Sequence, residues 1–133
     1  MSAVEVLRVA HAALTADAPL IAALGGPHVY EHVPARASPP YLVLSDIIAR
    51  DWSTATEEGA EVELTVRTFS DASNLTQLKA LQERVTTTLT FGAVAVPGHA
   101  LVDLRPLETA IERRPDDGLV VGTQRFLFII EPE

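Results

Sequence analysis

The sequence predicts a single α+β domain, with one mostly antiparallel sheet of about five strands and two main helices packed on one face of it. Apolar residues recur at helical spacing near the N-terminus and again in the middle of the chain. Other segments alternate apolar and polar residues, as strands with one buried face do. The 133 residues, 47 % of them hydrophobic, suit one domain over residues 1–133 with one core.

Two helices are expected before residue 27. The first runs from Ser2 to Leu14, and Ser2 and Glu5 have the spacing of a capping box. Its expected buried stripe consists of Val4, Leu7, Ala10 or His11, and Leu14. A second, short helix follows, with Asp17 as its cap and Pro19 in its first turn. Its apolar residues are Leu20, Ile21 and Leu24, and Gly25-Gly26-Pro27 ends it.

The next segments predict strands. Val29 to Val33 is short and extended, and Pro34 to Pro40 is a loop. Tyr41 to Arg50 and Ala60 to Phe69 are the two strands of an expected long antiparallel hairpin, joined by a polar stretch from Asp51 to Gly59. Val62, Leu64 and Val66 share one face of the second strand, and Glu61, Glu63 and Arg67 belong to its polar complement.

A longer helix and a second hairpin complete the chain. Ser73 or Asn74 can cap a helix that runs to about Thr90, with a stripe of Leu75, Leu78, Leu81 or Gln82, Val85 and Leu89. Gly92 to Val96 is read as a brief strand. Ala100 to Glu112 is a strand with a bulge or break at Pro106, because proline cannot donate to a ladder. A Pro115–Gly118 turn leads to the last strand, Leu119 to Ile130.

Composition restricts the classes of function. Cysteine is absent, which excludes disulfides, thiolate metal sites and cysteine nucleophiles. The net charge is −8 and Lys79 is the single lysine, so specific nucleic-acid binding is not expected. No apolar run approaches the ~20 residues of a membrane helix, and the N-terminus lacks the pattern of a secretory signal. We therefore expect no membrane segment and no leader.

One motif resembles a metal site. His28-Val29-Tyr30-Glu31-His32 matches the inverted zinc-protease pattern H-x-x-E-H. That chemistry needs a helix, which brings residues four apart onto one face near the metal. Here the motif lies between Gly-Gly-Pro and Pro34, a context that predicts extended chain. Two histidines four apart in a strand are about 13 Å apart, too far to share one zinc ion. We expect no metal site here.

No other pattern indicates catalysis or a cofactor. Two pairs of carboxylates are adjacent in expected turns or loops: Asp116-Asp117 and Glu57-Glu58. An acid–base pair needs two carboxyl groups that converge on one substrate from different environments, and adjacent residues in an exposed loop do not provide this. Nucleophile-elbow, dinucleotide-binding and phosphate-loop motifs do not occur. His11 is expected to be a partly buried core or interface residue, and His99 a turn residue. We expect no catalytic residue, no cofactor and no enzymatic activity.

The expected interface residues lie in the hairpin loop and before the last turn. Trp52 is the only tryptophan and lies in a polar loop, where it is either an interface anchor or folded back on its own sheet. Arg113-Arg114 is weak as a nucleic-acid patch, and an intersubunit salt bridge is the better interpretation. The full set of candidates is Trp52, Asp51, Glu57, Glu58, Arg113 and Arg114.

The ordered combination of segments resembles a known family. The matching segments are Asp17 to Gly26, Val29-Tyr30, Val33-Pro34, Pro40 to Leu44, Val62 to Ser70, the Ala80-Leu81 helix, and Asp117-Gly118 with the strand after it. They resemble the small tail-completion proteins encoded beside the tail-tube gene in long-tailed phages and in phage-like gene-transfer particles. The resemblance extends over nearly the whole chain and includes no catalytic residue to carry over.

The resemblance implies a tail terminator, a hexameric ring that caps the tail tube, stops its polymerisation and joins the tail to the head side. Its implied partners are further copies of itself, the tail tube protein and a head–tail connector or stopper protein. It would reside in the bacterial cytoplasm during assembly and then in the tail of a virus-like particle, with DNA passing through its lumen. The alternative is a small-molecule-binding or enzyme domain. Its only candidates are Asp46, Asp103 and Arg105, which have no recognisable spacing.

Overall fold

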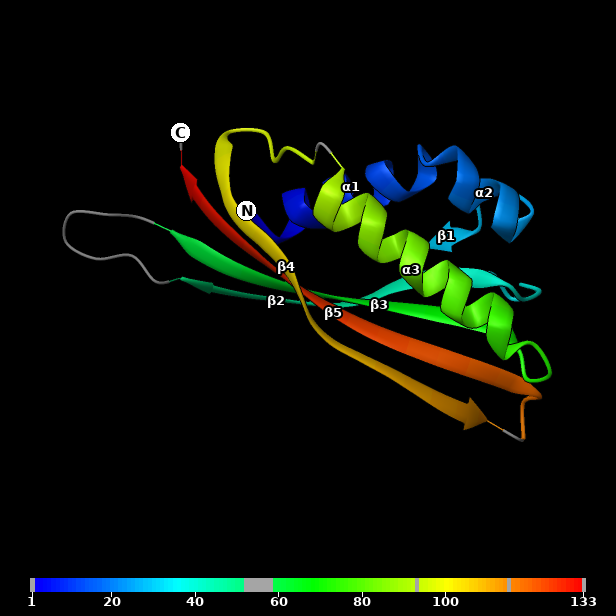
Figure 1. The fold of residues 1–133 in the computed structure, drawn as a ribbon. Helices are drawn as coiled ribbons and strands as arrows, with labels where there is room; N and C mark the ends of the chain where they lie inside the picture. Colours follow the sequence, from blue (N-terminus) through cyan, green and yellow to red (C-terminus); the bar gives the residue numbers. More distant parts are fainter. Residues whose placement is uncertain (1, 52–58, 93, 115, 133) are drawn as a thin grey trace.

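The computed structural model describes residues 2–51, 59–92, 94–114 and 116–132, with the backbone alone at Ser2 and Asp51. Its elements in chain order are α1 (Ser2–Thr15), α2 (Ala18–Leu24), β1 (Val29–Tyr30), β2 (Tyr41–Asp51), β3 (Ala60–Asp71), α3 (Leu75–Phe91), β4 (His99–Arg114) and β5 (Leu119–Pro132). The strands form one sheet in the order β1-β2-β3-β5-β4. Only the β1–β2 pair is parallel. All three helices lie on the same side of the sheet (Figure 1), which confirms the α+β prediction.

The main core lies between the helices and the sheet. Helix α1 buries Val6, Ala10 and Leu14, and α3 buries Leu78, Leu81, Gln82, Val85 and Leu89. The stripe predicted for α3 is confirmed apart from Leu75, which is half-buried. The stripe predicted for α1 is wrong at Val4, which is 53 % exposed, while Val6 is fully buried. Both residues fit a helical repeat, and the contact with the sheet decides which face of α1 is buried.

The helix ends follow their local chemistry. The side chain of Asp17 accepts a hydrogen bond from the backbone N–H of Leu20, and Gly25 ends α2 in a left-handed conformation with φ of 79°. Asn74 caps α3 by accepting from the backbone N–H of Gln77. Within the described residues no single helix is long and apolar enough to cross a membrane, and the α1–α2 pair, bent by 76°, passes that test by length and composition alone.

The β2–β3 hairpin is confirmed, with a register shift between Leu44 and Asp46. The register of β4 on β5 also shifts between Pro106 and Glu108, so the predicted irregularity at Pro106 is confirmed. The brief strand predicted at residues 92–96 is wrong. The described part of that segment is a loop, and Val96 from it is buried in the main core.

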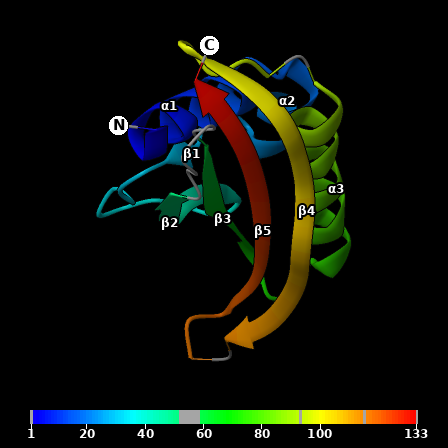
Figure 2. The same cartoon turned by 90° about the vertical axis from the view of Figure 1, so that its left-hand side faces the viewer.

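A second apolar cluster lies on the sheet face that the helices leave open. Residues alternate between faces along a strand, so Leu42 and Leu44 join the main core while Tyr41 and Val43 point the other way. The members of this cluster are Tyr41, Val43, Phe69 and Val121, with Tyr30, Ala37 and Leu119 packed against them. Ala37 belongs to the loop of residues 31–40, which extends on the β2 side of the molecule, opposite β4 (Figure 2).

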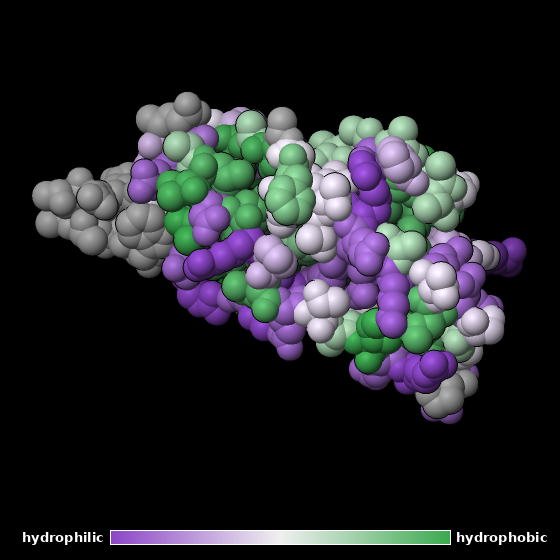
Figure 3. All heavy atoms as spheres, in the orientation of Figure 1, coloured by the Kyte–Doolittle hydropathy of each residue, from purple (hydrophilic) through white to green (hydrophobic). Residues whose placement is uncertain are grey.

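Strand β4 forms the other edge of the sheet. It is paired with β5 along its whole length, and no strand of the described residues covers its outer edge. Every residue from Arg105 to Arg114 is exposed. Figure 3 shows hydrophobic side chains at two places along this strand, separated by a hydrophilic band. The exposed large apolar residues of β4 are Val102, Leu107 and Ile111.

Candidate functional site

The histidine motif is not helical, as the sequence predicts, but its strand is shorter than the expected Val29 to Val33 and ends at Tyr30. His28 precedes β1, Tyr30 ends it, and Glu31 and His32 lie in the exposed bend that follows. The Nδ1 of His28 lies 2.9 Å from the hydroxyl of Tyr30. Because the segment is not helical, its two histidines and glutamate do not share the face that a zinc-protease site requires. No group of three or more potential metal-ligating residues occurs within the ranges that the structure describes.

The carboxylates considered for a ligand-binding or enzyme site do not converge. Asp103 pairs with Arg105 on its own strand at 3.6 Å, and both side chains are exposed. Asp46 lies 4.0 Å from Arg67, and both of these are exposed as well. Pairs of this kind contribute about 0–1 kcal/mol to stability.

The remaining histidines have structural surroundings. His11 is half-buried, as predicted, and its Nε2 lies 2.9 Å from the carbonyl oxygen of Val29. His99 is the first residue of β4, with its Nδ1 3.0 Å from the carbonyl of Pro97 and 3.5 Å from the carboxylate of Glu5. In the described part of the chain, the polar contacts of both rings are with backbone carbonyls and one carboxylate, and not with a hydroxyl group.

The predicted interface residues divide into two groups. Trp52, Glu57 and Glu58 lie outside the described residues, and Asp51 is the last residue of β2, opposite Ala60. Arg113 and Arg114 end β4 and are exposed. Arg114 pairs with Asp117 of the following turn at 2.5 Å, and Arg113 donates to the carbonyl of Ala72 at 3.4 Å. Both arginines thus have partners within the chain, and their role at an interface stays a prediction.

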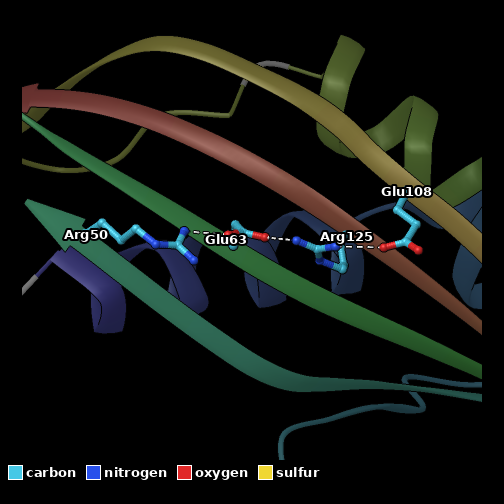
Figure 4. Close-up of polar contacts among 4 residues, drawn as sticks. All are labelled: Arg50, Glu63, Glu108 and Arg125. Carbon is cyan, nitrogen blue, oxygen red and sulfur yellow. Dashed lines mark hydrogen bonds and ion pairs between the residues drawn. The ribbon is translucent and has the colours of Figure 1, made fainter. Parts of the chain in front are cut away.

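An ion-pair ladder crosses four strands on the face opposite the helices (Figure 4). Glu63 of β3 accepts from Arg50 of β2 at 2.5 Å and from Arg125 of β5, and Arg125 also donates to Glu108 of β4 at 2.7 Å. Glu63 is only 8 % exposed. The hydrogen bonds from Arg50 and then Arg125 lower the pKa of Glu63 below its usual value, against the effect of burial.

The ladder was not readable from the sequence, where Glu63 is one of the polar residues of an alternating strand. Arg125 stands opposite Thr65 and Arg50 opposite Glu61, so both arginines are diagonal neighbours of Glu63. Only the registers of two separate strand pairs bring them together. The ladder thus connects side chains of β2, β3, β5 and β4 across the open face of the sheet.

A second charged contact joins two helices. Asp17, which caps α2, accepts from the Nε and the Nη2 of Arg84 in α3, both at 2.7 Å. This two-pronged contact lowers the pKa of Asp17, with the hydrogen bond from Arg84 as the main cause. The sequence indicates the cap but not the arginine, which lies 67 positions further on.

An open groove of about 520 Å³ separates α3 from the distal half of the β4–β5 hairpin. Its lining is Lys79, Gln82, Glu83, Thr86, Thr87, Thr109, Ile111 and Gln124. Amide, hydroxyl and apolar groups predominate, and a charged pair of carboxylates or a histidine is missing from this lining.

Comparisons with known proteins agree with a structural role. The model of the family described as "Tail completion protein gp17" matches residues 10–131. A solved structure described as "Virion of native gene transfer agent (GTA) particle" contains a chain with 27 % identity and a TM-score of 0.81. The alignment covers 92 % of this chain and 91 % of that one. No curated protein matches the sequence. The chain therefore belongs to the tail completion protein gp17 family, whose members are structural tail proteins and not enzymes.

Proposed function

We propose that this protein is a tail terminator, a hexameric ring that caps the finished tail tube, ends its polymerisation and joins the tail to the head side. The observation that carries the proposal is the family match over residues 10–131. The likeness to a chain of a gene transfer agent virion supports it, because it extends over more than nine-tenths of both chains.

The sheet edges support a ring. A closed ring of identical subunits needs a head-to-tail contact between two different surfaces. One open edge is β4, and the other is the part of β2 beyond Val43, because β1 pairs only with Leu42 and Val43. Neither edge has a strand partner in the described part of the chain. Free edges of this kind are suited to contact a neighbouring subunit.

The partners follow from the role. One face of the ring would meet the tail tube protein and the other a head–tail connector or stopper protein. The protein would assemble in the bacterial cytoplasm and end in the tail of a virus-like particle. With 18 acidic against 10 basic residues, an acidic lumen would let DNA pass without holding it.

The hairpin loop is our proposed docking element, with Trp52, Asp51, Glu57 and Glu58 as its candidate contact residues. Arg113 and Arg114, at the end of β4, are separate candidates for intersubunit salt bridges. We expect Trp52→Ala to impair docking to the tube or connector while the far-ultraviolet circular dichroism and the Tm stay unchanged. Val4→Ala, a change at an exposed apolar residue of α1 outside the hairpin and the proposed sheet edges, is the matched control. Normal particle assembly by the Trp52 variant would refute the role of this residue.

Negative-stain microscopy of the purified protein tests the ring itself. We expect rings as wide as a tail tube, formed in a concentration-dependent way, and we expect tails of uncontrolled length when the gene is deleted. Complementation with the wild-type gene is the control for the deletion. A compact monomer at all concentrations, together with tails of normal length in the deletion strain, would exclude a terminator.

A further inference from the structure

The ion-pair ladder ends with opposite charges at the two edges of the sheet (Figure 4). On β2 it begins with Arg50, whose side chain is 53 % exposed, and on β4 it ends with Glu108, whose side chain is 56 % exposed. Charges alternate between these two ends, from arginine to glutamate to arginine to glutamate. A second copy placed edge to edge would bring its own Arg50 to this Glu108 and continue the alternation. In charge, each end of the ladder is therefore complementary to the other end and not to itself.

Each free sheet edge contains one regular run of backbone. On β4 the register shifts at residues 101–103 and again between Pro106 and Glu108, and proline has no N–H to donate, so the regular run is residues 108–114. On β2, β1 covers the edge only as far as Val43 and the register shifts before Asp46, so the regular run is residues 46–51. No strand in the described ranges pairs with the outer side of either run. A strand of another chain can satisfy the N–H and C=O groups of such a run.

The order of the strands makes the two runs compatible in direction and in hydrogen-bonding phase. Strands β2, β3, β5 and β4 are joined by antiparallel pairs alone, so β2 and β4 run in opposite directions. A copy added edge to edge, with its helices on the same side, therefore presents β2 antiparallel to β4. Along a row of paired residues, hydrogen-bonded and non-hydrogen-bonded pairs alternate. One such row is Asp46, Thr65, Arg125 and Glu108. The outward backbone groups of β2 and β4 thus belong to residues of the same face and meet in phase.

One register brings the side chains of the two runs into agreement. It places Ala110 of β4 opposite Arg50 of the next copy, so that this arginine lies diagonally beside Glu108. Diagonal neighbours already form the Arg50 contact within the ladder. On the helix side of the sheet the same register sets Ile111, which is 40 % exposed, opposite the exposed Ala49 of the next copy. Each face of the contact therefore joins side chains of compatible chemistry.

The charges at the far end of the run select this register over its neighbour. In the register described, Asp46 of the next copy stands opposite Arg114, which is exposed. A displacement by two residues, which would set Arg50 directly opposite Glu108, would also set Asp46 opposite Glu112. Like charges directly opposite each other destabilise a strand pair, whereas opposite charges stabilise it by about 0.2–1 kcal/mol.

The register also fits a closed ring. Within one copy, successive pairs place Arg50 level with Ile129 of β5, whereas Ala110 pairs with Thr123, six residues away along β5. The next copy would therefore be displaced by about 20 Å along the strands, at ~3.3 Å per residue, and by about 19 Å across the four strand spacings of ~4.8 Å from one β4 to the next. Strands arranged in this way tilt by about 45° to the ring axis, close to the roughly 35–45° of closed barrels.

We propose that residues 108–114 of β4 pair antiparallel with residues 46–51 of β2 in a second copy of this chain. The two strands lie on opposite sides of β3 and β5 (Figure 2). Each copy therefore offers β4 to one neighbour and β2 to the other. Such a contact is head-to-tail and is the type that closes a ring. The inference rests on the proposed ring and names the two surfaces that would meet in it, with their register.

Disulfide trapping tests the register, because the chain has no cysteine of its own. Ile48 and Glu112 would stand opposite each other, and both are exposed and outside the ladder. Within one chain they are separated by β3 and β5, so the double variant Ile48→Cys/Glu112→Cys can form disulfides only between chains. After mild oxidation we expect covalent species from dimer to hexamer on a non-reducing gel, and monomer alone for each single variant. Circular dichroism checks that all variants fold.

A matched control comes from the same edge. Val102 lies on β4 at 55 % exposure but outside residues 108–114, so Ile48→Cys/Val102→Cys should remain monomeric on the gel. Equal trapping at position 102 would overturn the proposal, because β2 would then meet the first half of β4 or meet the edge without a fixed register. Dimers from Glu112→Cys alone would show β4 meeting β4 and would overturn it as well.

A charge exchange tests the same contact without cysteines. Asp46→Arg would face Arg114 of the neighbouring copy, and we expect loss of rings at a protein concentration at which the wild type forms them. The double variant Asp46→Arg/Arg114→Asp restores opposite charges at this position and should restore the rings. If the double variant loses rings as completely as Asp46→Arg does, the register is wrong.

Negative-stain microscopy of the cysteine variants separates this inference from the proposed ring. Rings without trapped species would leave the terminator proposal standing and overturn the strand pairing. Trapped species without closed rings would support the strand pairing and count against the ring. Absence of both would overturn both proposals.

Discussion

Gly122→Ala tests whether the packing of α3 on β5 is as close as the structure indicates. An ideal Cβ at Gly122 would lie 2.1 Å from the Nε2 of Gln82, 2.7 Å from its Cδ and 3.3 Å from the Cδ1 of Leu78. The first two distances are far below van der Waals contact, so the amide end of the buried Gln82 side chain must move. Overpacking of a core lowers the free energy of unfolding by about 1–3 kcal/mol, whereas replacing a strand glycine by alanine raises it by roughly 0.5–1 kcal/mol.

We therefore expect Gly122→Ala to lower the free energy of unfolding by about 1–2 kcal/mol, which corresponds to a Tm lower by roughly 3–8 °C. Urea titration followed by circular dichroism measures the free energy. The matched background is Gln82→Ala, which removes the obstructing side chain but keeps the backbone carbonyl that Gln124 uses. In that background Gly122→Ala should be neutral or slightly stabilising. An equal loss in both backgrounds would refute the reasoning, and so would stabilisation of the wild type.

The charged contacts support three further predictions, all read by urea titration. Asp17→Ala should lower the free energy of unfolding by about 0.5–2 kcal/mol through the lost cap alone. Asp17→Asn keeps an oxygen for the N–H of Leu20 and should lower it less. Equal losses in the two variants would show that the cap does not stabilise the helix. Glu63→Gln should cost about 1–2 kcal/mol, since it weakens charged hydrogen bonds to partly exposed arginines, and no change would show that the ladder contributes nothing. The pKa of each carboxyl is lowered on folding from ordinary values of 3.8 for Asp17 and 4.5 for Glu63, so their stabilisation is present above those values and is lost as the pH falls through the lower folded pKa. Wild-type stability should accordingly decline below about pH 4.5, with a smaller decline in the Glu63 variant, and equal slopes for the two proteins would contradict the assignment to Glu63.

Local chemistry made most elements predictable. The helix ends are marked by residues that act on backbone groups close to them in the sequence. The side chains of Asp17 and Asn74 accept hydrogen bonds from backbone N–H groups, and Gly25 adopts the left-handed conformation that ends α2. Alternation along residues 60–69 predicts a strand with one buried face, and Val62, Leu64 and Val66 are indeed fully buried. The described part of residues 92–96 is a loop where a strand was expected, because a short apolar run beside a glycine is equally compatible with a strand and with a buried loop.

Contacts between distant residues were not predictable. Arg84 reaches Asp17 across 67 positions and Arg125 reaches Glu63 across 62. Neither pair has a spacing that distinguishes it from the other acidic and basic residues of the chain. The unpartnered amides of Gln82 and Gln124 are equally invisible in the sequence, where Gln82 is simply an alternative member of a helical stripe.

The sequence by itself determined the α+β class, the Asp17 cap, the two hairpins, the non-helical geometry of the histidine motif and the resemblance to the tail-completion family. Each depends on residues near one another in the chain or on their order along it. Only the tertiary structure decided that β5, the last strand, lies between β3 and β4, that α1 buries Val6 rather than Val4, and that a groove opens beside α3. These features depend on which strands pair and in which register, and pairing is settled by packing across the whole chain.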